Sequence, residues 1–83
     1  MTRRSLDVHI PVDSAATAHA VAQALAVERD DVPPRTTVEV EALGAEVHIR
    51  IESDEARGLR AAANSFLKWA DAAIGVARTV RPG

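Results

Sequence analysis

Two histidines, His9 and His48, stand in segments where polar residues alternate with β-branched apolar ones. In strands with this alternation both imidazoles lie on the outward polar face of a sheet, near three glutamates: Glu39, Glu41 and Glu46. Imidazole and carboxylate groups perform acid–base chemistry and bind zinc, but a zinc site needs three or four converging ligands. No His-x-x-x-His pair or comparable spacing occurs. We therefore expect a solvated polar face with no metal site, and His19 alone on a helix surface.

Residues for other catalytic chemistry are also missing or dispersed. The 83-residue chain has no cysteine, which excludes disulfides, cysteine-based zinc sites and a thiol nucleophile. The serines have no histidine or lysine at a suggestive spacing, and the four glycines are scattered, so no phosphate-binding loop exists. We expect no catalytic residues, no cofactor and no enzymatic activity.

A basic stripe is the remaining candidate for chemistry. Arg57, Arg60 and Lys68 fall on one polar stripe of a predicted helix, with Arg78 further along. This stripe could contact phosphate groups or an acidic partner, or it could be a solvated helix face. A net charge of −2 and the presence of only one Phe and no Tyr argue against autonomous nucleic-acid binding by charge or by stacking.

The strands that carry the polar face are predicted from period-2 alternation. Residues 6–12, 36–42 and 47–52 each place apolar side chains on one face. The turn 43–45 contains Gly44 and joins the second and third runs into a β-hairpin. Pro11 indicates an edge position or the end of the first strand.

Two helices complete the prediction. The first spans Ala15–Arg29, with Asp13 or Ser14 as its N-cap, and ends before the loop 30–35 that contains Pro33 and Pro34. The second begins at residues 53–55, with Ser53 or Asp54 as its N-cap, and runs to about Val80 before Pro82 and Gly83.

The element order predicts an α+β fold, a two-layer β-α-β-β-α sandwich with two helices on one face of a three-stranded sheet. We expect a single domain over residues 1–83. No signal peptide and no run of about 20 apolar residues is present, so we expect a cytoplasmic protein without membrane contact.

Both predicted helices are apolar on more than one face, and most of the 17 alanines lie in them. A small three-stranded sheet lacks the area to cover all of these faces. We therefore predict a partner-binding helical surface, with Trp69 as its anchor. Its residues are Ala16, Ala20, Ala24, Val27, Ala62, Ser65, Trp69, Ala72 and Val76.

The segment 56–67, which reads ARGLRAAANSFL, resembles the signature of the small dimerisation subunit of the KEOPS (EKC) complex. This family also includes the cancer/testis-antigen proteins, and the resemblance extends over residues 8–80. Gly58 departs from the serine usual at this position, and Ala61 and Ala63 replace bulkier aliphatic residues.

The resemblance implies a non-catalytic homodimer that docks its two helices on the threonylcarbamoyl-transferase subunit. The dimer would bridge two copies of a complex that forms N6-threonylcarbamoyladenosine in tRNA, whose chemistry, metal and ATP belong to other subunits. The resemblance further implies that Phe66 and Leu67 pin the last helix to the sheet, with Asn64 and Ser65 at the margin of the partner surface.

Two alternatives to this function remain open from the sequence. One is a small α/β RNA-binding module that contacts tRNA directly through the arginine stripe and the polar sheet face. The other is a dimeric domain that senses a small ligand, which requires a closed polar pocket.

Overall fold

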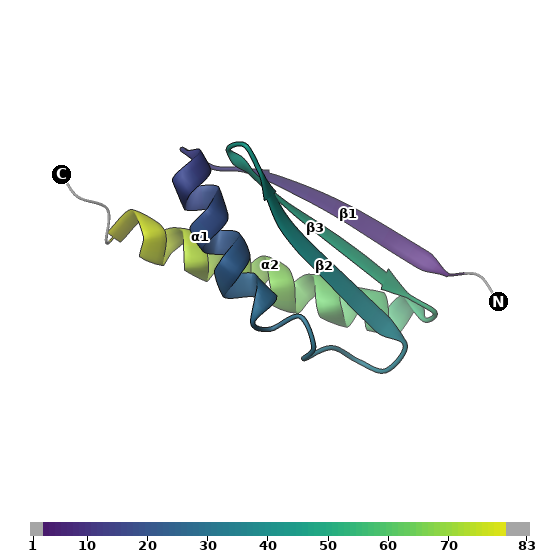
Figure 1. Ribbon diagram of the computed structural model, residues 1–83. Coiled ribbons are helices and arrows are strands. Elements are labelled where there is room, and N and C mark those ends of the chain that lie inside the picture. The colour runs from purple at the N-terminus through teal and green to yellow at the C-terminus, as the bar shows by residue number, and fades with distance from the viewer. Residues whose placement is uncertain (1–2, 80–83) are drawn as a thin grey trace.

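The computed structural model describes residues 3–79, with side-chain surroundings through Ala77 (Figure 1). The elements are β1 (Arg4–Pro11), α1 (Ala15–Ala26), β2 (Thr36–Leu43), β3 (Glu46–Ser53) and α2 (Ala56–Thr79). The predicted order and the α+β class are confirmed. The predicted helix end at Val80, the residues Pro82 and Gly83, and the side chain of Arg78 lie outside the described residues.

The sheet has the strand order β1-β3-β2, and both pairings are antiparallel. The hairpin partner β3 is therefore central, while β1 and β2 form the two edges. Pro11 is the last residue of β1, at an edge, where its missing N–H costs no ladder hydrogen bond. This order brings the first strand directly beside the third.

The hairpin forms as predicted and is tighter than predicted. Leu43 pairs with Glu46, so the turn consists of Gly44 and Ala45 alone. Gly44 has a φ of 59°, a conformation that type II′ turns require at their first central residue and that glycine adopts without strain.

The start of α1 agrees with the prediction, whereas its end does not. Ser14 is the N-cap, and its hydroxyl accepts a hydrogen bond from the Thr17 amide at 3.1 Å. The helix ends at Ala26 instead of Arg29. Beyond this point the backbone amides donate to the carbonyl three residues earlier instead of four, as Glu28 does to Leu25 at 3.0 Å.

The start of α2 corrects the N-cap prediction. The first carbonyl that accepts a hydrogen bond of this helix is that of Glu55, to which the Leu59 amide donates at 3.0 Å. Glu55 therefore occupies the N-cap position. Ser53 is instead the last residue of β3, and its hydroxyl accepts the Glu55 amide at 3.2 Å. Ser53 is needed in the sheet, so the helix starts at Ala56, later than either predicted cap would place it.

Both helices cover the same face of the sheet, as Figure 1 shows, and the core lies between these layers. The core joins small residues of the helices to β-branched residues of the strands and to the ring of Phe66, which is completely buried. Its members are Ala18, Val21, Leu25, Val38, Val47, Ile49, Ile51, Ala62, Ala63, Phe66 and Ala70.

Leu67 does not pin α2 to the sheet, contrary to the expectation, because 43% of its surface is exposed. No helix of the described part is both long and apolar enough to cross a membrane.

Candidate functional site

The outer face of α1 carries the first half of the predicted partner surface. Ala16, Ala20, Ala24 and Val27 are all exposed, and Val27 has 80% of its surface exposed. The parallel row on the inner face is buried in the core; it consists of Ala18, Val21, Ala22 and Leu25. Helix α1 therefore has two apolar faces, and the described residues bury one of them and leave the other exposed.

On α2 the predicted division into faces needs one correction. Ala62 was expected on the partner surface, but only 2% of it is exposed and it lies in the core. Residues 62, 66 and 70 form one row four residues apart, and this row faces the sheet. The buried face of α2 therefore includes Ala62 and excludes Leu67, whereas the sequence pattern predicted the reverse for both residues.

Trp69 and Ser65 lie at the margin of the core. The Trp69 ring packs edge-on against Phe66, with centroids 5.1 Å apart and planes at 72°, and the residue is half-buried. Further along α2, Ala72 and Val76 are exposed, and Figure 1 shows the C-terminal turns of α2 projecting past the sheet. Trp69 therefore contributes to the packing of this chain, whereas Ala72 and Val76 are exposed and lie outside the core.

The basic stripe lies where the sequence predicts it. Arg57, Arg60 and Lys68 are exposed along α2, as is Asn64 between them. None of the three cations forms an ion pair with another described residue. The stripe is a solvated helix face, with three positive charges free to meet an external group.

The open sheet face consists of cross-strand rows of charged residues. Arg50 on β3 stands between Asp7 and Glu39, and it donates to Asp7 and to Glu52, each at 3.2 Å. The hydrogen bond to Glu52, and then the negative charges of Asp7 and Glu52, raise the pKa of Arg50 above its ordinary value. The face is acidic on balance, which disfavours the predicted contact of this face with tRNA.

A shallow hollow of about 350 Å³ lies on this open face and contains both His9 and His48. It opens to solvent over the sheet, so it lacks the closed polar pocket that a ligand-sensing domain requires.

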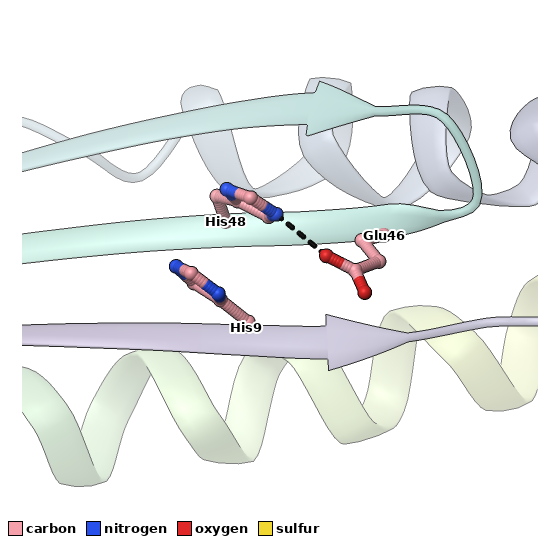
Figure 2. Close-up of side chains that lie close together, drawn as sticks. All are labelled: His9, Glu46 and His48. Atoms are coloured by element: carbon pink, nitrogen blue, oxygen red, sulfur yellow. Dashed lines mark hydrogen bonds and ion pairs between the residues drawn. The ribbon is translucent and has the colours of Figure 1, made fainter.

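Both histidines line this hollow, and Figure 2 shows them side by side on neighbouring strands, with Glu46 closer to the hairpin turn. Their rings stack with centroids 3.9 Å apart and planes at 8°. His48 Nε2 lies 2.8 Å from Glu46 Oε1, and because an ionised carboxylate only accepts, the imidazole donates this hydrogen bond. Sequence reasoning placed the three side chains on one face, and the two histidines could approach one another only if the first strand lay beside the hairpin. The strand order β1-β3-β2 meets this condition.

Residues 5–78 match the protein family Pcc1, described as Transcription factor Pcc1. No curated protein matches the chain.

Proposed function

The chain belongs to the Pcc1 family, and we propose that it is a non-catalytic scaffold subunit of the KEOPS complex. In this role it forms a homodimer that bridges two threonylcarbamoyl-transferase subunits during the formation of N6-threonylcarbamoyladenosine in tRNA. The proposal includes a single domain over residues 1–83 and a cytoplasmic location. The match covers most of the chain, including the 56–67 segment that carries the resemblance to KEOPS subunits.

The observation that carries the proposal is the exposed apolar row formed by Ala16, Ala20 and Ala24 on α1 and by Val27 at its C-cap. These short side chains leave a smooth surface on which a second helix can approach closely, and no element of the described chain covers it. The exposed Ala72 and Val76 on α2 offer further apolar contact. An accessory subunit that docks by helix packing needs this kind of surface.

The docking surface in the proposal is narrower than the set expected from the sequence. Ala62 is excluded because it is in the core, and Ser65 and Trp69 contribute only their exposed edges. Replacing Trp69 by Glu would also break its contact with Phe66, so that variant does not separate docking from folding.

The proposal is tested by measuring binding of the purified chain to the transferase subunit. Ala20→Arg places a long charged side chain in the middle of the α1 row, and we expect affinity to fall at least about tenfold. His19→Arg adds the same side chain at an exposed polar position about 100° around the helix from Ala20 and is the matched control, with binding retained. Equal binding by the wild type and Ala20→Arg contradicts the docking surface.

The oligomeric part of the proposal is tested by sedimentation equilibrium. We expect a dimer alone and a larger assembly with the transferase subunit. A strictly monomeric chain that ignores the transferase contradicts the scaffold function. The family description refers to transcription, so a direct test of the tRNA role is also needed. Unchanged threonylcarbamoyladenosine in tRNA after deletion of the gene would contradict the proposed KEOPS function.

The second candidate function is direct contact with tRNA. It is favoured by Arg57, Arg60 and Lys68, which are exposed and form no ion pair with a described residue. Under this function the double variant Arg57→Glu with Arg60→Glu abolishes a salt-sensitive tRNA interaction of the isolated chain. If the isolated chain does not bind tRNA, or if the double variant binds as well as the wild type, the complex alone supplies the contact.

A further inference from the structure

We propose that His9, His48 and Glu46 bind one divalent transition-metal ion, with zinc the best chemical match, on the open face of the sheet. This site is independent of the helical docking surface, because the sheet face that carries it points away from the helices.

The backbone fixes the three positions. His9 on β1 and His48 on β3 are direct partners in the antiparallel register, so their side chains lie next to each other on the same face of the sheet. Glu46 lies two residues before His48 on β3, which puts it on the same face. Ligands held on paired strands are positioned more rigidly than ligands on loops.

The distances between the ligand atoms suit a small metal ion. One ligand atom from each residue can be chosen so that all three lie within 4.8 Å of one another. A tetrahedral zinc site with bonds of about 2.0–2.1 Å separates its ligand atoms by about 3.3 Å. The contact between His48 Nε2 and Glu46 Oε1, at 2.8 Å, must open slightly. The ion then takes the place of the proton on Nε2, which moves to Nδ1 of the same ring or is released to solvent.

At least one of the stacked rings must also rotate, because the nitrogen lone pairs of parallel imidazoles lie in two separate parallel planes and do not converge on one ion. His9 is exposed on an edge strand, so its ring can rotate toward the ion without displacing the core. The His48 side chain is only 23% exposed and is held by Glu46, so it supplies the fixed end of the site.

The charge around the cluster favours a cation. Asp7, Glu39 and Glu41 line the same hollow, and Arg50 is the one cationic side chain among its lining residues. Glu41 stands opposite His48 on β2, on the side away from His9. An excess of carboxylates raises the local concentration of cations at the site.

The donor set selects the class of ion. Imidazole nitrogen suits zinc, nickel and copper, whereas magnesium and calcium prefer sites made entirely of oxygen. Two imidazoles and one carboxylate leave a fourth position for water. The bound ion would join the edge strand β1 to the central strand β3, and so stabilise the folded chain.

The direct test is a zinc titration of the untagged chain by calorimetry, with magnesium as the negative probe. We expect one zinc per chain, and affinity at least about tenfold weaker in His9→Asn and in His48→Asn. His19→Asn is the matched control: it removes the third histidine, which is exposed on α1, and binding is expected to be unchanged. Glu46→Gln weakens binding, while Glu39→Gln, a carboxylate outside the cluster, has a smaller effect.

A second readout uses stability and separates loss of the site from loss of the fold. Zinc should raise the melting temperature of the wild type and of His19→Asn, and should leave that of His9→Asn unchanged. None of the replaced side chains belongs to the core cluster, so every variant should still unfold cooperatively without zinc, with at most a small loss of stability from the ring stack and the His48–Glu46 hydrogen bond. Absence of binding, full binding by the His9→Asn/His48→Asn double variant, equal loss in His19→Asn, or one zinc shared by two chains overturns the proposal.

Discussion

At the scale of single residues, Gly58 shows how a position in α2 is determined by atoms of the sheet. A Cβ at position 58 would lie 2.7 Å from Ser53 Oγ and 2.8 Å from Thr36 Oγ1. These hydroxyls are buried and hydrogen-bonded to each other at 3.0 Å, and Ser53 also accepts the Glu55 amide. They cannot move without losing these bonds. The absence of a side chain at Gly58 therefore permits a close approach of helix and sheet.

We predict that Gly58→Ala lowers the free energy of unfolding by about 1–3 kcal/mol, because crowding of the hydroxyl pair exceeds the gain in helix propensity. Gly75→Ala is the matched control, since a Cβ there meets nothing within 4 Å. It should raise the free energy of unfolding by up to about 1 kcal/mol. Urea denaturation of both variants checks the pair, and a Gly58→Ala chain as stable as Gly75→Ala would refute the close approach.

Phe66 is the largest side chain of the core and is completely buried. We predict that Phe66→Ala lowers the free energy of unfolding by about 3–5 kcal/mol, since the loss of transfer energy is added to the cost of a cavity. Leu67→Ala should cost far less, because Leu67 is 43% exposed. Similar losses in the two variants, measured by urea denaturation, would show that the face of α2 is assigned incorrectly.

At the scale of elements, each helix start is set by a serine hydroxyl in a different way. Ser14 caps α1 itself, whereas Ser53 ends β3 and reaches the Glu55 amide from the sheet. The sequence offered a serine next to an aspartate as the N-cap at both places, and the pairing of Ser53 with Thr36 across the hairpin distinguishes the roles of the two serines. Local sequence identifies a donor or acceptor, while tertiary contacts decide what it binds.

The cap of α1 gives a prediction at this scale. Ser14→Ala removes the acceptor of the Thr17 amide and should lower the free energy of unfolding by about 1 kcal/mol. Ser14→Asp keeps a capping oxygen and should restore most of this loss. Thermal melts of the two variants are the measurement, and equal destabilisation by both would contradict the capping role.

At the scale of the whole molecule, one core joins every element. Residues from α1, β2, β3 and α2 form the buried cluster, and Val8 and Ile10 of β1 pack against it. Because no element has a separate core, none should unfold alone. The edge strand β1 is the least buried, with Leu6 37% exposed, and it is the strand that a zinc ion at His9 would hold.

We predict a single cooperative unfolding transition, consistent with one domain. Trp69 is the one tryptophan of the chain and contacts Phe66, so its fluorescence reports on the core. Far-UV circular dichroism reports on the helices, and the two curves should coincide in urea. Separate midpoints would show that part of the chain unfolds independently.

The sequence by itself determined the element order, the hairpin, the fold class and the two apolar faces of α1, because these depend on local periodicity and turn chemistry. It placed Ala62 and Leu67 on the wrong faces of α2, since a broad apolar helix does not specify its rotation about its own axis; the fit of Phe66 against the sheet does. It put His9, Glu46 and His48 on one polar face. Their meeting depended on β1 pairing with β3 in one register, which side-chain packing across the whole sheet decides.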